Sequence, residues 1–397
     1  MRPFEGVKIL DCTHVLASPF ATYQMAVLGA DVIKVEDPDD PDQSRVTGTD
    51  MALNKQRMGT NFLTQGSDKR SIALNLKTEG GRDAFRRLVG KWANVLVEGY
   101  RPGAFNALGL SYENLVAIKP NLIYMSMSAF GQQGPRSEQT AYDQVIQASS
   151  GITACTGTEE SGPIRAGAPI IDYATGTMGA FALSAALYQR LRTGKGQHID
   201  MAMLDVAMML QGSYITGYLY SGQHPKLAGN KMRFAESCIF DTKDGLLQVA
   251  ASNARQHRRF YAAIDEPSEA AKSDLDERYA RFDEKHKMIA AKMKAKTADE
   301  WEEYLQSRHV PAGRVRELRE ALEDPQLRYR SVLHKHSGVP GVAKEVTVPV
   351  AAFKFAHDGP KVTRPPARLG EHTDEILRSV GFGPQDITAL RKAGAIV

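Results

Sequence analysis

Short apolar runs alternate with helical patterns through the first part of the chain. Residues 7–12 and 31–36 are apolar runs typical of buried strands, and residues 19–28 between them have the pattern of a helix. Pro19 stands near the first turn of that helix, where its missing N–H is harmless, and Gly29 is expected to end it. This strand–helix–strand order is typical of a parallel sheet covered by helices.

The same alternation continues along the chain. Further strands are expected at residues 71–76, 94–98, 122–127 and 197–201, and helices at residues 79–90, 177–190 and 202–219. The pattern therefore predicts an α/β fold with a doubly wound parallel sheet. The polar stretch 37–66 is expected to be irregular, and connections of that length are usually functional or mobile.

The composition changes near residue 225. Residues 241–253 have the pattern of a hairpin around Lys243-Asp244-Gly245, and residues 255–307 are rich in charged side chains at helical spacing. We interpret those charges as solvated helix faces. The change predicts a second, smaller and more polar domain at residues 225–329.

Charge and cysteine content exclude several classes of protein. The 397 residues are 42% hydrophobic and 24% charged, which is ordinary for a globular chain with a large core. The net charge of +4 is dispersed, so it does not indicate a nucleic-acid-binding protein, although it suits an anionic small molecule. Three cysteines without CxxC spacing predict neither a disulfide framework nor a zinc site.

The sequence also predicts the cellular location of the protein. The N-terminus lacks the apolar core of a signal peptide, and no run of about 18 consecutive apolar residues is present. We therefore expect a cytoplasmic protein without a membrane span.

The stretch 168–176 brings one carboxylate, Asp172, to the start of a long apolar helix. One interpretation is a helix N-cap, a position at which Asp is preferred because its oxygen accepts free backbone N–H groups. The other is a catalytic carboxylate held at the positive end of a helix dipole. The local sequence favours the cap, and the rest of the chain must decide.

The first strand-to-helix turn, residues 13–18, lacks the G-x-G-x-x-G pattern of dinucleotide sites. A nicotinamide or flavin enzyme is therefore disfavoured. Ligands of open α/β sheets nevertheless bind outside the carboxyl ends of the strands, where His14 is expected to lie. His14 is either part of such a site or a loop histidine bonded to nearby backbone.

Six stretches together resemble the class III CoA-transferase family, also called the CaiB/BaiF type. In chain order they are residues 6–11, 28–36, 69–77, 97–103, 172–176 and 370–374. The resemblance implies a formyl-CoA transferase-like fold, with a Rossmann-like large domain built from both chain ends (residues 1–224 and 330–397) and a smaller α+β domain (225–329) inserted between them. It also implies an interlocked homodimer.

The resemblance further implies that Asp172 is a nucleophile. Its carboxylate would attack the thioester of an acyl-CoA to give a mixed anhydride, and the released thiolate would then form an aspartyl-CoA thioester. With a reference pKa near 3.9, such a carboxylate is ionised at neutral pH. No metal or redox cofactor is expected beyond the CoA thioester substrate.

The CoA-binding residues are also implied by the resemblance. They are His14, Leu16, Ala17, Leu74, Lys77, Tyr100, Arg101 and Tyr142. Lys77 and Arg101 suit phosphate oxygens by charge, although each also fits a solvated surface cation. Gly157 and Gly176 are small enough to let backbone N–H groups approach an oxyanion.

Departures from the family pattern narrow the reaction. Formyl-CoA:oxalate members have arginine at the positions of Asp37 and Ala107, and residues 229–233 lack their glycine run, so formate–oxalate exchange is disfavoured. Tyr142 stands where the racemase branch has a histidine, which argues against racemase chemistry. We therefore predict intermolecular CoA transfer to a carboxylic acid such as succinate. The alternatives are intramolecular transfer of the mesaconyl-CoA type, an acyl-CoA racemase or epimerase, and a non-catalytic CoA-binding subunit.

Overall fold

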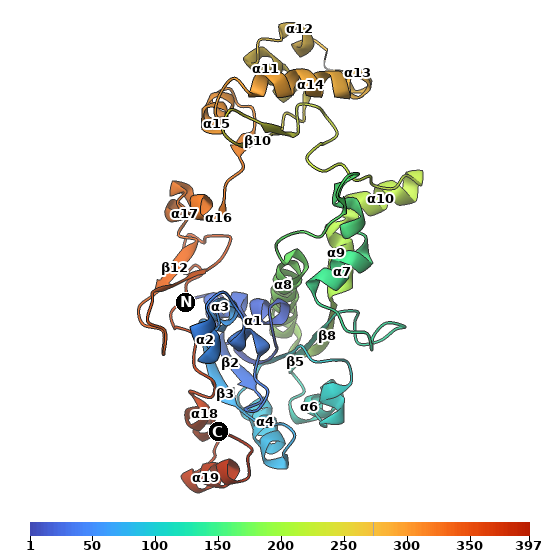
Figure 1. Cartoon of the computed structure of the whole chain (residues 1–397). Coiled ribbons are helices and arrows are strands. Elements are labelled where there is room, and N and C mark those ends of the chain that lie inside the picture. Colours follow the sequence, from blue (N-terminus) through green and yellow to red (C-terminus); the bar gives the residue numbers. More distant parts are fainter. Residues whose placement is uncertain (273) are drawn as a thin grey trace. The chain divides into compact units, whose positions relative to one another are not determined.

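The structure is a computed structural model that describes residues 1–272 and 274–397. The chain separates into two compact units (Figure 1). The first unit comprises Met1–Ile152, Arg165–Gln223 and Gln326–Val397, and the second comprises Thr153–Ile164 and His224–Pro325.

A six-stranded parallel sheet organises the first unit. Its strands follow the order β3-β2-β1-β4-β5-β8, which is the strand order of doubly wound dinucleotide-binding folds. The strands are β1 (Lys8–Cys12), β2 (Asp31–Glu36), β3 (Lys69–Ala73), β4 (Val95–Glu98), β5 (Ile123–Ser128) and β8 (Gln197–Ala202). The predicted α/β fold with a parallel sheet is therefore confirmed.

Helices cover both faces of this sheet because successive strand side chains point to opposite sides. On β1, Ile9 joins one apolar cluster and Leu10 the other. The first cluster lies under α1 (Ala17–Val27) and α8 (Ile170–Thr193). The second lies under α4 (Glu79–Lys91), α6 (Tyr112–Ile118), α18 (Thr373–Ser379) and α19 (Pro384–Lys392).

Two glycines let α8 pack closely against its neighbours. A Cβ on Gly176 would lie 2.5 Å from the backbone oxygen of Ala17, at the start of α1. A Cβ on Gly179 would lie 2.7 Å from the Met127 side chain on β5. Gly176 therefore allows the first turns of α1 and α8 to touch.

We expect Gly176→Ala to lower the free energy of unfolding by about 1–3 kcal/mol, because the new methyl group meets backbone rather than a movable side chain. This loss would exceed the gain of about 1 kcal/mol that alanine brings to a helix interior. Gly80→Ala in α4 is the matched control, since its Cβ would meet side-chain atoms and no backbone: Leu390 Cδ2 at 2.8 Å and Ala395 Cβ at 3.5 Å. Equal urea midpoints for the two variants would contradict this packing role.

Helix α8 is also long and apolar enough to cross a membrane by length and composition, a property that core helices share. The absence of a membrane span stays a prediction.

Two stretches fold differently from the sequence prediction. The stretch expected to be irregular contains η1 (Gln43–Val46), α2 (Met51–Lys55) and α3 (Thr60–Gly66). These elements are shorter than an apolar period needs to show itself. The helix expected at residues 202–219 is two helices, α9 (Met203–Leu210) and α10 (Gly212–Ser221). The rest of the first unit includes α5 (Ala104–Ala107), α7 (Asp143–Ser150), most of α17 (Pro325–Arg330), β12 (Leu333–His336) and β13 (Val346–Pro349).

The second unit has its own apolar core. Strands β9 (Ile239–Asp241) and β10 (Leu246–Val249) form the predicted hairpin, and β11 (Ala312–Arg314) pairs with β10. Its core includes Phe260 and Trp301. The remaining elements are η2 (Thr153–Cys155), β6 (Gly157–Thr158), β7 (Gly162–Pro163), α11 (Ala254–Ala263), α12 (Pro267–Ala270), α13 (Leu275–Ala280), α14 (Phe282–Met293), α15 (Ala298–Gln306) and α16 (Leu318–Leu322).

Candidate active site

Asp172 lies in the first turn of α8 and does not cap it. The helix starts at Ile170, and its N-cap residue, Pro169, has no side chain that can accept a hydrogen bond. The capping carboxylate comes instead from another helix and belongs to Asp143, the first residue of α7. Its Oδ2 accepts the N–H groups of Ile171 at 2.8 Å and of Asp172 at 3.1 Å. The N-cap interpretation of Asp172 is therefore wrong, and its carboxyl group is left for another role.

The surroundings of Asp172 favour its neutral form. Burial raises the pKa of its carboxyl group from 3.8 to about 7, and the negative charge of Asp143 adds to the rise. The sequence-based expectation of a fully ionised carboxylate at neutral pH therefore has to be corrected. Near pH 7 the group is poised between its two forms, as is common for groups that do chemistry.

Asp172 lines a cavity of about 640 Å³, which we call the Asp172 cavity. The cavity lies in the first unit and is bounded by the turns that follow β1, β4 and β5. Six of the eight residues predicted to bind CoA line it too: His14, Leu16, Ala17, Tyr100, Arg101 and Tyr142. The structure therefore brings segments far apart in sequence together around one carboxyl group.

The turns after β1 and β4 support each other beside this cavity. The ring of His14 meets the edge of the Tyr100 ring, with centroids 5.0 Å apart. Burial lowers the pKa of His14, and the nearby Lys34 ammonium lowers it further, so both favour the neutral imidazole. The buried Glu98 accepts the backbone N–H of Tyr100 at 2.9 Å, which holds the second turn in place.

Leu74 and Lys77 are not among the residues that line the cavity. Leu74 is buried in the core against α4, and its backbone pairs with Ile396. Lys77 is exposed and forms an ion pair with Asp37 at 3.0 Å. The CoA contacts proposed for both stay predictions.

The two glycines considered for oxyanion contacts belong to different units. Gly176 packs against α1, as described above, whereas Gly157 belongs to the second unit. The suggested contact between either glycine and an oxyanion stays a prediction.

A second cavity of about 570 Å³, the polar chamber, shares several residues with the first. Val15, Leu16, Gln43 and Tyr142 line both. Its other lining residues are Ser44, Thr47, Thr60, Asn61, Thr64, Gln65, Pro169 and Tyr173. Nine of its twelve lining residues carry an amide or hydroxyl group, and none is lysine or arginine. Such a surface can bind a carboxylate through hydrogen bonds without adding charge.

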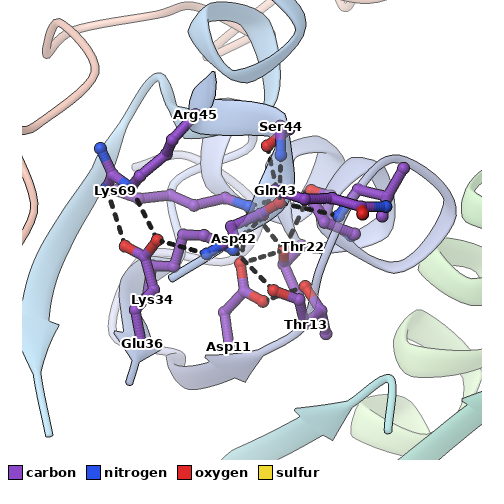
Figure 2. A network of polar contacts seen from close by, with 12 residues as sticks. Asp11, Thr13, Thr22, Lys34, Glu36, Asp42, Gln43, Ser44, Arg45 and Lys69 are labelled. Atoms are coloured by element: carbon purple, nitrogen blue, oxygen red, sulfur yellow. Dashed lines mark hydrogen bonds and ion pairs between the residues drawn. The ribbon is translucent and has the colours of Figure 1, made fainter. Parts of the chain in front are cut away.

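Beneath the β1–α1 turn lies a cluster of six charged side chains, which we call the buried ion network (Figure 2). Its members are Asp11, Lys34, Glu36, Asp42, Arg45 and Lys69, and all are nearly inaccessible to solvent. Three ion pairs join them. Lys34 pairs with Asp42 at 2.8 Å, Arg45 with Glu36 at 2.6 Å, and Lys69 with Asp11 at 2.7 Å. Three cations and three anions balance, as buried charges require.

The charged states of the Lys34–Asp42 pair support each other. Although burial opposes both charges, the carboxylates of Asp42, Asp11 and Glu36 raise the pKa of Lys34, and the Lys34 ammonium lowers the pKa of Asp42. Both groups are therefore ionised at neutral pH. In contrast, burial lowers the pKa of Lys69 to about 8.

Sequence reasoning missed Asp143, Gln43 and the buried ion network. Asp143 acts on N–H groups 28 and 29 residues further along the chain, so no local pattern reveals it. Gln43 donates to the hydroxyl of Tyr142 at 3.2 Å from the stretch that was expected to be irregular. An N-cap pattern, Asp followed by a short polar helix, was the one available signal there.

Comparison with known proteins decides the family. A model of CoA-transferase family III matches residues 4–373. The chain belongs to this family. It is similar to succinyl-CoA:glutarate CoA-transferase from Homo sapiens, with 32% identity over 401 residues covering 100% of this chain and 90% of the relative. It is also similar to succinyl-CoA:mesaconate CoA-transferase from Haloarcula marismortui, with 30% identity over 396 residues covering 96% and 97%.

A solved structure supports the same conclusion. A CaiB/BaiF family protein from Brucella suis superposes with a TM-score of 0.82 at 30% identity, covering 96% of this chain and 99% of that one. The predicted resemblance to class III CoA-transferases is therefore confirmed, and the protein is an enzyme of this class. Among the described residues, no group of three or more His, Cys, Asp or Glu side chains could hold a metal ion.

Proposed function

We propose that this family III enzyme transfers CoA from a short dicarboxylyl-CoA, such as succinyl-CoA, to a second dicarboxylic acid, with Asp172 as the nucleophile. The observation that carries the proposal is the position of Asp172 in one cavity with six of the eight residues expected to bind CoA. The relatives named above act on succinyl-CoA with glutarate or mesaconate, which supports short dicarboxylates as substrates.

In the proposed reaction, the ionised Asp172 attacks the thioester carbonyl, the C–S bond breaks, and a mixed anhydride and CoA thiolate result. The thiolate then attacks the aspartyl carbonyl, which releases the donor acid and leaves an aspartyl-CoA thioester. The acceptor carboxylate enters, and the same steps run in reverse. Every bond made or broken involves the two acids, CoA and Asp172, so the proposal includes no further cofactor.

The two cavities suggest where the parts of the substrate bind. The Asp172 cavity has the proposed CoA residues around it, and the adjoining polar chamber offers amides and hydroxyls. We assign the thioester end of CoA to the first and the distal carboxylate of the acid to the second. The amides and hydroxyls of this chamber can donate hydrogen bonds to the distal carboxylate. Because no cationic side chain lines the chamber, water molecules bound with the carboxylate would complete its solvation.

Isotope exchange tests the proposal. Succinyl-CoA incubated with ¹³C-labelled glutarate should yield labelled glutaryl-CoA, and mass spectrometry should detect a CoA adduct on Asp172. Incubation with mesaconyl-CoA and no free acid would reveal intramolecular transfer, because CoA would then move from one carboxyl group of mesaconate to the other. Deuterium entering the α-carbon without label exchange would instead indicate an epimerase. A protein that binds these thioesters and turns none over would contradict the enzymatic mechanism.

We further propose that the protein is the homodimer that the resemblance implies, with the second unit as an inserted domain. Support comes from large apolar side chains left exposed on α8 and α10, among them Phe181, Leu191, Leu219 and Tyr220. We expect light scattering to give twice the 43.5 kDa mass of one chain. A monomer at micromolar concentration would contradict this assembly.

A further inference from the structure

The turn between β1 and α1 has an unusual backbone at Val15. Its φ angle is +69°, in the left-handed region that β-branched residues rarely adopt. Such a conformation persists only where the surroundings hold it. Val15 lines both the Asp172 cavity and the polar chamber, and His14 before it lines the first. The strained turn is therefore part of the proposed binding site.

The Lys34–Asp42 ion pair holds this turn on both sides of His14. The Lys34 ammonium donates to the backbone oxygen of Thr13 at 2.7 Å, which fixes the peptide group before His14. Asp42 Oδ1 accepts the N–H of Val15 at 3.0 Å, which fixes the peptide group after it. The pair itself is 2.8 Å long and fully buried (Figure 2). Lys34 and Asp42 thus form a clamp: together they hold the peptide groups on the two sides of His14.

The Asp42 carboxylate also positions a residue that lines both cavities, Gln43. Asp42 Oδ1 accepts the backbone N–H of Ser44 at 2.9 Å and its hydroxyl at 2.7 Å, which starts η1. Gln43 in this short helix lines both cavities and donates to Tyr142. Neither Lys34 nor Asp42 is among the residues that line these two cavities, so both act on them through the backbone they hold.

We propose that Lys34 and Asp42 are positioning residues that keep the β1–α1 turn, with Val15 left-handed, in the form that binds the CoA thioester. The proposal rests on the proposed function and deepens it, because it assigns a role in substrate binding to two residues that do not touch the substrate. It predicts that loss of the pair weakens the binding of CoA although neither side chain touches it.

The test uses the full-length protein with the charge-balanced variant K34M/D42A, which removes both hydrogen bonds to the turn without leaving a buried unpaired charge. We expect this variant to bind free CoA about tenfold or more weakly in calorimetry, the affinity change that such backbone strain produces. The KM for the acyl-CoA should rise in parallel. Adding Val15→Gly should restore part of the CoA affinity, because glycine adopts a left-handed backbone without strain.

The matched control is E36Q/R45M, which removes another ion pair of the same network that makes no hydrogen bond to the turn. Glu36 accepts the backbone N–H of Asp42 at 3.3 Å, and the glutamine oxygen of the control can still accept it. This control should bind CoA as the wild type does, even if it unfolds at a lower temperature. An equal loss of CoA affinity in both double variants would show a general effect on folding and would overturn the proposal. So would K34M/D42A binding CoA as tightly as the wild type.

Hydrogen exchange keeps the proposal testable if K34M/D42A does not fold. In the wild-type protein without ligand, the Val15 amide should exchange at least about tenfold more slowly than an unstructured amide, because a buried carboxylate accepts it. An unprotected Val15 amide would overturn the clamp. A wild-type protein that keeps this protection but binds no CoA would contradict the proposed function and leave the clamp itself intact.

Discussion

Replacing Asp172 with asparagine should abolish CoA transfer and, at alkaline pH, make the protein more resistant to heat. Asparagine keeps the shape of the side chain but cannot form the anhydride, so kcat should fall by about 10³-fold or more. No adduct should form at this position. Steady-state kinetics and mass spectrometry of the trapped intermediate would measure both effects.

The gain in stability follows from the raised pKa of Asp172. The carboxyl group ionises near pH 7 in the folded protein but near pH 3.8 in the unfolded chain, so ionisation favours unfolding. The stabilising contribution of the neutral group is present at low pH and is lost as the pH rises through about 7. The Asn variant does not titrate and escapes this loss.

The thermal midpoints of Asp172→Asn and wild type should therefore differ at pH 8 and converge toward pH 4. Asp205→Asn is the control, because it replaces another acid in the first turn of a helix, α9, that lines neither cavity. A variant less stable than wild type at pH 8 would show that the carboxylate of Asp172 stabilises the fold.

The second large effect is the pH dependence of the first chemical step. Because the carboxylate form of Asp172 is the nucleophile, acylation should slow by about tenfold for each pH unit below 7 and level off above it. Asp143→Asn keeps an oxygen that can accept the N–H groups of α8 but removes the neighbouring negative charge. Its inflection should therefore lie at lower pH than in the wild type.

Rapid-quench measurement of acyl-CoA consumption between pH 5 and 8 would locate both inflections. A single-turnover experiment is needed because product release can mask a chemical step. A flat wild-type profile, or an Asp143→Asn profile that coincides with it, would contradict the assigned pKa and the role of Asp143.

The sheet could be predicted from sequence because several of its strands, such as β1, β2 and β4, are short runs in which apolar side chains predominate. Residues 31–36 form β2 as expected, and the strands on either side of it in sequence shift by at most a few residues. The short elements between β2 and β3 could not be predicted, because the caps at Asp42 and Asp50 start helices too short to show a period. Periodicity detects burial over several turns and is blind to a single capped turn.

The candidate site, too, could be predicted from the sequence only in part. Motif order identified the family and placed Asp172 beside the turns that carry His14 and Tyr100. The start of α8 was expected seven residues too late, because the capping group comes from Asp143 on another helix. Side chains that act through distant backbone leave no mark in the local sequence.

The buried ion network also restricts how this protein can change over evolutionary time. Losing any one of its three cations or three anions would strand the partner in a dry interior, a change that typically costs about 3–5 kcal/mol and can exceed the stability margin of a domain. Viable lineages must therefore exchange partners jointly, through rare double replacements or a permissive intermediate. Related sequences should accordingly show correlated substitution at positions 34 and 42, 36 and 45, and 11 and 69.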